Sequence, residues 1–412
     1  MSKMHRLVIV GRPNDGKSSI FANFLGDDEV AVSPIPGETK RMQPRQINLG
    51  DKNIEIIDTP GLQHPEAVLE EFEEYSRCGR NPAQAFAEDF KDPRYAHDVE
   101  IMKALSEADI CMLVVNADNY FGHTQQCLLD IFTSLSSRTA LIGVLNRTDP
   151  SFLPEWREAF ASRGIDCFDF DAFKSRFSDC AKLFEQICQS PALRKRGELC
   201  ETLRALRQNR DKLWQSNIDC AANEILNSLR DIMQKRSHLR LKHFSLSPEE
   251  AGELKSELAR DISNLARFFK IDILKRFKYS GIRLKSADFK VSEEEICAKS
   301  PNIFRRILGE LPFVKKPEAM AFAKSDSELP LRFVLESLNY IVSLVSFSYA
   351  QSATKEFELN LQKSARSIGG FDSAKLQKYA AKASAGDDSD AFFKLHSELR
   401  AQLFEALINA AK

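Results

Sequence analysis

The sequence predicts a doubly wound α/β domain with a mainly parallel sheet, followed by a mostly α-helical domain. Residues 6–170 alternate short apolar runs with longer amphipathic segments, which is typical of strands connected by helices. From about residue 199 the strand signals fade, and apolar residues recur every three or four positions instead. The 412 residues also exceed the usual domain size of about 100–200 residues. We therefore expect residues 1–195 and residues 196–412 to form separate domains.

Five segments of the first domain are predicted to be buried strands, because each is short, apolar and bounded by polar or turn-forming residues. They are residues 7–10, 54–57, 111–115, 140–145 and 165–170. The connection between Gly61 and Ala108 is unusually long and contains the acidic run 66–74. We expect this connection to form additional helices.

The second domain contains one well-marked long helix. Ser247 is suited to be its N-cap, Pro248 occupies the first helical position, and Glu249 and Glu250 follow in the first turn. Its apolar face is predicted from residues at spacings of three and four: Leu254, Leu258, Ile262, Leu265, Phe269 and Ile273. A further helix is predicted from about Pro330.

Composition indicates an ordinary globular protein, with 43% hydrophobic and 28% charged residues. No apolar stretch approaches the roughly 18 residues of a membrane span. The nine cysteines show neither a C-x-x-C pair nor His/Cys ligand spacing, so we expect reduced thiols and a cytoplasmic protein. The net charge is −1, yet residues 191–290 hold 22 Lys/Arg against 13 Asp/Glu.

A complete G-x-x-x-x-G-K-S loop occupies residues 11–18, directly after a predicted strand and directly before the helical pattern of residues 19–25. Its glycines let backbone N–H groups surround phosphates, Lys17 reaches the β and γ oxygens, and Ser18 ligates Mg²⁺. This context favours a phosphate-binding loop over a chance glycine turn and predicts an α/β P-loop NTPase fold. The remaining candidate contacts to the nucleotide are Asn14, Asp15, Gly16 and Ser19.

Two further segments fit the same site. Asp58 and Gly61 lie in the sequence Asp-Thr-Pro-Gly directly after a strand, where a carboxylate approaches Mg²⁺ and a glycine N–H senses the γ-phosphate. Thr39, in the intervening segment, is a candidate Mg²⁺ ligand that closes when the γ-phosphate is present. Taken alone, the Asp-Thr-Pro-Gly segment could be a strand-end turn, and Thr39 would be better explained as an ordinary loop residue. Their order after the P-loop favours the functional interpretation of both.

The choice of base is predicted from Asn146, Arg147 and Asp149, at the end of the strand 140–145. The Asp149 carboxylate can accept hydrogen bonds from N1 and N2 of guanine, a donor pair that adenine lacks. This pattern favours GTP and GDP over ATP. The alternative is a turn or N-cap cluster before the helix near Pro154.

In their order and spacing these motifs resemble the Era/TrmE-like P-loop GTPases of the TrmE-Era-EngA-septin class. The resemblance is carried by residues 11–18, by Val-Ala-Val-Ser-Pro at 30–34 and by Pro-Gly at 36–37. Trp-Arg-Glu at 156–158, Phe-Asp-Phe-Asp at 168–171 and Leu-Arg-Phe-Val at 331–334 resemble bacterial Era-like GTPases with a C-terminal helical domain of unknown function. The resemblance implies a G domain that hydrolyses GTP with Mg²⁺, with Lys17, Thr39, Gly61 and Asn14 as its catalytic groups.

The sequence departs from that family at several positions. Arg147 stands where the guanine motif usually has Lys, and Asp15 stands where many Era-like loops have Val. Asp-Ala-Phe at 171–173 replaces an expected Ser-Ala-Lys, so only the backbone N–H of Ala172 is carried over as a base contact. Leu62, rather than a water-positioning Gln, follows Gly61. Both a hydrolysing switch and a nucleotide-stabilised scaffold with negligible hydrolysis therefore stay open.

Asn14 matches the family position that can help to hold K⁺ beside the β and γ phosphates, although Asn is also a common turn residue. The resemblance further implies a protein partner, integral membrane proteins included, and allows peripheral attachment at the inner membrane and a nucleotide-dependent dimer. The basic window 191–290 fits a solvated helix face, an anionic membrane surface or an acidic protein. RNA is less favoured, since no KH-type G-x-x-G loop or RNP aromatic pattern is present.

Overall fold

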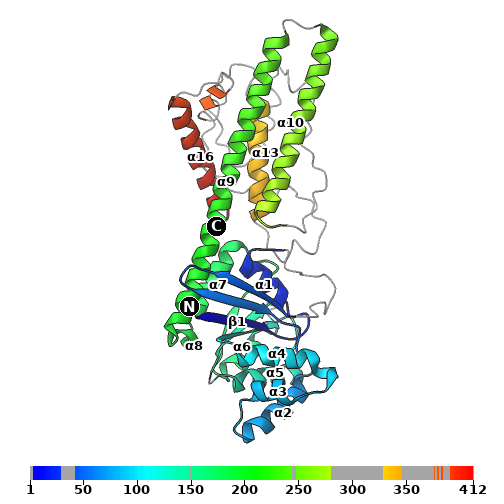
Figure 1. Ribbon diagram of the computed structural model, residues 1–412, viewed down its shortest axis with the longest axis vertical. Helices are drawn as coiled ribbons and strands as arrows, with labels where there is room; N and C mark the ends of the chain where they lie inside the picture. Colours follow the sequence, from blue (N-terminus) through cyan, green and yellow to red (C-terminus); the bar gives the residue numbers. More distant parts are fainter. Residues whose placement is uncertain are drawn as a thin grey trace. The chain divides into compact units, whose positions relative to one another are not determined.

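The computed structural model describes residues 3–28, 42–136, 138–147, 151–243, 247–279, 328–345, 375, 378–379, 382–383 and 390–411 (Figure 1). Thr39, Asp149 and all of residues 30–37 lie outside the described residues. The chain divides into two compact units, and the boundary in the described part falls between Lys212 and Leu213. The predicted domain boundary at 195/196 stays a prediction.

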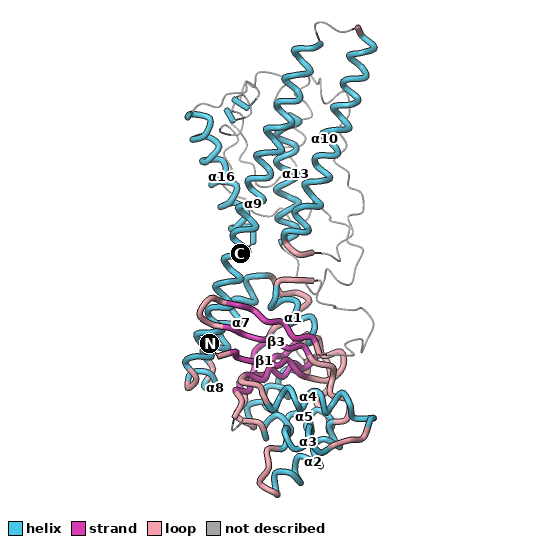
Figure 2. Tube along the Cα trace, viewed as in Figure 1, coloured by secondary structure: helices cyan, strands magenta, loops and turns pink. Residues whose placement is uncertain are grey.

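Unit 1 is built on a six-stranded sheet in the order β2-β3-β1-β4-β5-β6, drawn in magenta in Figure 2. All pairs are parallel except β2–β3. The five predicted strands are confirmed, with small shifts at their ends: β1 (Met4–Val10), β3 (Asn53–Asp58), β4 (Ile110–Asn116), β5 (Ala140–Asn146) and β6 (Asp166–Asp169).

The sequence analysis missed one strand, β2 (Gln43–Asn48). Its sequence QPRQIN has no apolar alternation, because an edge strand with both faces largely in solvent has little to bury. Pro44, which cannot donate to a ladder, is tolerated at such an edge. The pairing is reinforced by Gln46, whose Nε2 donates to Glu55 Oε1 at 3.0 Å.

Two apolar clusters cover the two faces of the sheet, because successive side chains of β1 point to opposite sides. Leu7 and Ile9 pack with α1 (Lys17–Leu25), α7 (Phe177–Gln189) and the start of α9 (Gly197–His243). Val8 and Val10 face the other cluster. The helices on that side are α2 (Pro65–Arg77), α3 (Pro82–Asp89), α4 (Ala96–Ser106), α5 (His123–Ser134) and α6 (Leu153–Ala161).

The expected extra helices between Gly61 and Ala108 are confirmed as α2, α3, the short 3₁₀ turn η1 (Pro93–Tyr95) and α4. Asn81 caps α3 by accepting the N–H of Ala83 at 3.2 Å. A short helix, α8 (Pro191–Arg194), separates α7 from α9.

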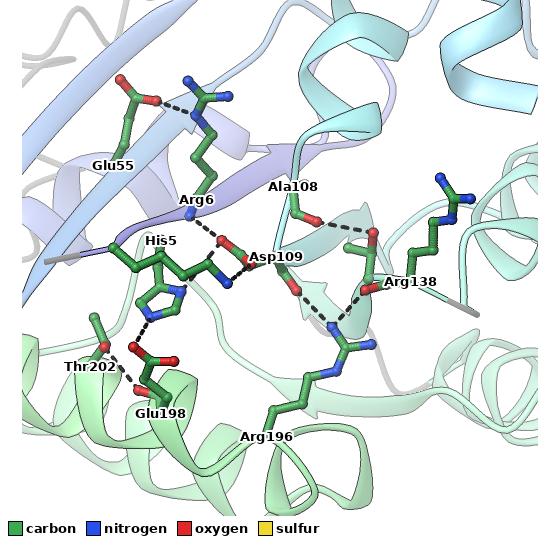
Figure 3. Close-up of polar contacts among 11 residues, drawn as sticks. His5, Arg6, Glu55, Ala108, Asp109, Arg138, Arg196, Glu198 and Thr202 are labelled. Atoms are coloured by element: carbon green, nitrogen blue, oxygen red, sulfur yellow. Dashed lines mark hydrogen bonds and ion pairs between the residues drawn. The ribbon is translucent and has the colours of Figure 1, made fainter. Parts of the chain in front are cut away.

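α9 is a continuous helix of 47 residues that starts in unit 1 and continues into unit 2. Figure 3 shows how its beginning is held to the sheet. Arg196 Nη1 donates to the carbonyl oxygens of Arg138 at 2.8 Å and Asp109 at 3.3 Å. The buried ring of His5 lies 3.5 Å from a carboxylate oxygen of Asp109 and 3.5 Å from one of Glu198.

Unit 2 is helical throughout its described part: the remainder of α9, α10 (Pro248–Arg276), α13 (Glu328–Val345) and α16 (Asp390–Ala411). The predicted start of α10 is confirmed as a capping box, in which Ser247 Oγ accepts the Glu250 N–H at 3.3 Å and Glu250 Oε2 accepts the Ser247 N–H at 2.8 Å.

The predicted apolar face of α10 and the predicted later helix are also present. Leu258, Ile262, Phe269 and Ile273 are buried, while Leu254 and Leu265 are half-buried. Tyr340 of α13 donates its hydroxyl to the Lys270 carbonyl at 2.9 Å. None of the described helices has both the length and the hydrophobicity needed to cross a membrane.

Candidate nucleotide-binding site

The P-loop connects the end of β1 to the start of α1 and depends on glycine for close approach. Gly16 has φ 90°, and a Cβ there would lie 2.0 Å from Asn146 Nδ2. At Gly11 a Cβ would lie 2.2 Å from the Val114 carbonyl oxygen. Asn14 also adopts a positive φ of 68°, which Asn tolerates better than most residues, and it is exposed. The predicted loop is therefore formed with its backbone close to two neighbouring strands.

Three ionisable side chains of this site are almost completely buried: Asp15, Lys17 and Asp58. Desolvation lowers the pKa of Lys17, although Asp58 and Asp15 oppose that shift. Desolvation raises the pKa of Asp15 to about 6 and that of Asp58 to about 6, in both cases against the favourable charge of Lys17. Such perturbed groups gathered at one site mark a candidate functional centre.

Lys17 and Asp15 also hold the loop itself. Lys17 Nζ donates to the Arg12 carbonyl at 2.8 Å, and Asp15 Oδ2 accepts the Arg12 N–H at 2.9 Å. One carboxylate oxygen of Asp15 is therefore bound to the loop main chain. Its charge is nevertheless part of the cluster that a bound nucleotide would meet.

The residues predicted to hold Mg²⁺ fit that ion. Ser18 Oγ donates to Asp58 Oδ2 at 2.5 Å. The other oxygen, Asp58 Oδ1, is buried and has no hydrogen-bond partner among the described residues, which is costly for a carboxylate unless a cation or its water shell meets it. Mg²⁺ prefers oxygen ligands and keeps several waters, so a hydroxyl beside a carboxylate is a suitable donor set.

Asn146 joins three loops of the site, although the sequence suggested a contact to the base. Its Nδ2 donates to the Asp15 carbonyl at 2.9 Å, and its Oδ1 accepts the Ala172 N–H at 3.0 Å. Asn23 Nδ2 donates to the Ala172 carbonyl at 2.9 Å. The Ala172 N–H, expected to meet the base, is thus engaged with protein. Arg147 follows with φ 50° and an exposed side chain.

The Asp-Thr-Pro-Gly segment is fastened to the P-loop. Thr59 Oγ1 donates to the Ile9 carbonyl at 2.8 Å, and the Leu62 N–H donates to the Gly11 carbonyl at 3.0 Å. A Cβ at Gly61 would lie 2.2 Å from the backbone nitrogen of Pro13, so only glycine fits there. Leu62 is buried, whereas Gln63 is exposed.

Comparison with known proteins decides which class of P-loop protein this is. The family of 50S ribosome-binding GTPases matches residues 6–147, the span that contains the P-loop, Asp58 and Asn146. Unit 1 contains a P-loop GTPase domain. It is homologous to the GTPase domains of MnmE and Der.

The tRNA modification GTPase MnmE of Streptococcus pneumoniae serotype 4 is 33% identical over 147 residues, which are 36% of this chain and 25% of MnmE. GTPase Der of Clostridium perfringens strain SM101 is 28% identical over 144 residues, 35% of this chain and 28% of Der. The chain therefore spans about a quarter of the length of these relatives. A structure of Aquifex aeolicus Era bound to GDP and aluminium fluoride covers 46% of this chain and 57% of Era, with 22% identity and a TM-score of 0.32.

Residues 58–64, which contain the Asp-Thr-Pro-Gly segment, are called the second switch from here on. One residue that contacts this segment, Asp98, carried no signal in the sequence. Asp98 of α4 accepts the Gln63 N–H at 2.9 Å and lies 2.8 Å from His64 Nδ1. It belongs to no motif and follows its partners by 34 and 35 residues, so only the packing of α4 brings them together.

Proposed function

We propose that the protein binds Mg²⁺–GTP, hydrolyses it to GDP and phosphate, and passes its nucleotide state through α9 to the helical unit 2. The observation that carries this proposal is the buried pair Lys17 and Asp58, in which Asp58 Oδ1 has no hydrogen-bond partner within the part of the chain that the structure describes. A triphosphate with Mg²⁺ supplies the charges that this cluster lacks. The match of residues 6–147 to GTPases supports guanine as the base.

Each residue has a distinct task in this proposal. Lys17 binds the β and γ oxygens, Ser18 and Asp58 hold the Mg²⁺ shell, and the Gly61 N–H meets the γ-phosphate. Bound Mg²⁺ supplies positive charge to the phosphate oxygens as the γ-phosphate leaves. Thr39 closes over the metal, and Asp149 selects guanine. Gly16, Asp15 and Ser19 line the phosphates from the loop and the start of α1.

Leu62 cannot orient the attacking water, because its side chain is apolar and buried. We therefore propose a slow intrinsic rate that another cation accelerates. Asn14 is exposed and lies at the turn of the loop, which supports our proposal that it helps to hold K⁺ beside the phosphates. Replacing Na⁺ by K⁺ at constant ionic strength should then raise turnover at least about threefold, and Asn14→Ala should remove that gain. Equal rates in both salts would favour a group supplied by a partner.

α9 is the proposed link to unit 2. Its early residues Leu199, Leu203 and Leu206 belong to the same buried cluster as α1, which begins at the P-loop. A continuous helix of 47 residues that starts in this cluster can carry a displacement beyond the GTPase domain.

The partner of unit 2 is proposed to be an acidic protein, either membrane-associated or not, that contacts the basic window 191–290. Part of that charge is already used within the chain: Lys235 pairs with Asp261 at 2.8 Å, and Arg276 with Asp272 at 3.5 Å. An RNA-associated GTPase is the second candidate, since the matching family is described as ribosome-binding and MnmE as a tRNA modification GTPase. RNA binding that weakens steeply with salt would favour it.

Binding and single-turnover measurements test the proposal together. Calorimetry should give micromolar or tighter binding of GTP and GDP and far weaker binding of ATP, and Asp149→Asn should shift preference toward xanthine nucleotides. Equal affinity for ATP and GTP would refute the choice of base. Tight GTP binding without phosphate release, with K⁺, liposomes, RNA and co-purifying proteins each present, would favour the nucleotide-stabilised scaffold.

A further inference from the structure

Asp98 lies at the junction between the second switch and the helical insertion α2–α4. Its side chain is 1% exposed, yet it carries a carboxylate. Oδ1 accepts the main-chain N–H of Gln63, and Oδ2 contacts Nδ1 of the half-exposed His64 ring. Both oxygens are therefore used on two consecutive residues that directly follow the Asp-Thr-Pro-Gly-Leu segment.

A carboxylate in such a place loses its hydration, and only hydrogen bonds of good geometry compensate for that loss. The two contacts, at 2.9 and 2.8 Å, have that geometry. Asp98 also lies in the first turn of α4, where the helix dipole favours a negative charge. These contacts fix the position of the Asp98 carboxylate, and with it the positions of Gln63 and His64.

These contacts attach the second switch to α4 in addition to its attachment to the P-loop. The Leu62 N–H donates to the Gly11 carbonyl, and Gly61 lies against Pro13. One residue later, the Gln63 N–H donates to Asp98. The consecutive N–H groups of Leu62 and Gln63 therefore donate to two different elements, the P-loop and α4. These two hydrogen bonds restrict the conformations that the segment can adopt.

The His64 ring extends this attachment into the insertion. Its centroid lies 4.6 Å from that of Tyr95, and Tyr95 packs edge-on against Phe90 at 5.0 Å. Phe90 in turn stacks on Phe86, which is buried in the core of the insertion. The insertion therefore offers a packed support for the second switch and not only a covering layer.

We infer that Asp98 is a positioning residue for GTP hydrolysis, which holds Gln63 and His64 so that the Gly61 N–H meets the γ-phosphate. This inference rests on the proposed GTPase function. Asp98 is not among the residues assigned to the nucleotide or to Mg²⁺, and it acts through Gln63 and His64. GDP lacks the γ-phosphate, so the attachment affects the triphosphate state selectively.

The test compares Asp98→Ala, Asp98→Asn and His64→Ala with the wild type in the full chain. Glu100→Ala, which removes an exposed carboxylate from the same helix, is the matched control. The measurements are the affinities for GDP and for a non-hydrolysable GTP analogue, the single-turnover rate at saturating GTP, and the melting temperature.

Asp98→Ala should lower the single-turnover rate, and the affinity for the analogue relative to GDP, by about tenfold or more each, as expected when a buried charged acceptor is lost. Asp98→Asn should show a smaller loss, because its amide oxygen can still accept the Gln63 N–H. His64→Ala should also show a smaller loss, since one of the two contacts remains. Glu100→Ala should match the wild type.

Wild-type values for both the rate and the affinity ratio in folded Asp98→Ala would overturn the inference. An equal loss of GDP and analogue affinity would overturn it as well, because that pattern indicates a general structural role. If Asp98→Ala does not fold, the ratio of the analogue affinity to the GDP affinity is measured in Asp98→Asn and His64→Ala instead. If the wild type binds but does not hydrolyse GTP, the proposed hydrolysis fails, while the affinity ratio still decides whether Asp98 positions Gly61.

Discussion

The two ends of β1 place charged side chains in opposite situations. At the carboxyl end, Asp15, Lys17 and Asp58 are buried with shifted pKa values, and no described residue forms a hydrogen bond with Asp58 Oδ1. At the amino end, Asp109 accepts the Arg6 main-chain N–H at 3.0 Å and lies 3.2 Å from Lys3 Nζ.

The amino-end cluster is satisfied largely by its own members, together with Glu55, which pairs with Arg6 at 2.9 Å, and Arg196, which donates to two carbonyls. The ring of His5 is the exception, since its Nδ1 is buried without a hydrogen bond. Charged groups that pair with one another stabilise the fold, whereas a buried carboxylate with an unpaired oxygen is a candidate ligand-binding group. Function is therefore expected at the carboxyl end, and stability at the amino end.

The largest expected effect is the loss of triphosphate binding in Lys17→Met. The variant removes the cation that reaches the β and γ oxygens, so affinity for GTP should fall by about a hundredfold or more. The free energy of unfolding of the nucleotide-free variant should stay within about 1 kcal/mol of the wild-type value. The variant loses the desolvated charge of Lys17 and its hydrogen bond to the Arg12 carbonyl together, so the two effects largely offset each other. Calorimetry and urea unfolding give the two numbers. A folded Lys17→Met that binds GTP normally would contradict the assignment.

The next effect is a pH dependence of the nucleotide-free protein. The pKa of Asp15 and of Asp58 rises from its ordinary value of 3.8 to about 6 in the folded state. Between these values the folded state binds more protons than the unfolded state, so these groups make stability fall as pH rises from about 4 to about 6. Each carboxyl can contribute up to about 3 kcal/mol.

Asp58→Asn tests this in urea unfolding at pH 4.5 and pH 7. The variant should lose much of its pH dependence relative to the wild type and be more stable at pH 7, while Mg²⁺-dependent GTP binding is lost. Other carboxyls cancel in this comparison because both proteins contain them. A variant that is less stable than the wild type at pH 7 would show that Asp58 is satisfied without a ligand.

Asp109→Asn, at the amino end of β1, should have a smaller effect on stability than Asp58→Asn, and of the opposite sign. Loss of the charged acceptor for the Arg6 N–H and of the Lys3 pair should destabilise the protein by about 1–2 kcal/mol, since the site is partly exposed. Affinity for GDP should not change. Thermal unfolding and GDP titration measure the two quantities, and weaker GDP binding would break the proposed division between the two ends.

The smallest effect is expected for Lys3→Ala. Its ammonium group pairs with Asp109, but its side chain is 59% exposed. A surface pair of this kind contributes about 0–1 kcal/mol and is weakened by salt. A change in stability above that range, measured at low and high ionic strength, would show that the amino-end cluster acts as a cooperative network.

The sequence by itself determined the parallel strands, the P-loop and the start of α10. The local signals for these elements, apolar runs, fixed glycine spacing and an N-cap, act within a few residues of one another. It did not reveal β2, because a polar edge strand takes its structure from pairing with β3 rather than from a core of its own.

Within the site, the sequence singled out Asn146 but not its hydrogen bonds to the carbonyl of Asp15 and the N–H of Ala172, which lie 131 and 26 residues away in the chain. The attachment of Gln63 and His64 to Asp98 likewise depends on how α4 packs. Contacts between distant residues are set by which helices cover which face of the sheet, and no local pattern encodes them. The tertiary structure alone therefore decided which buried charges satisfy one another and which are left for a ligand.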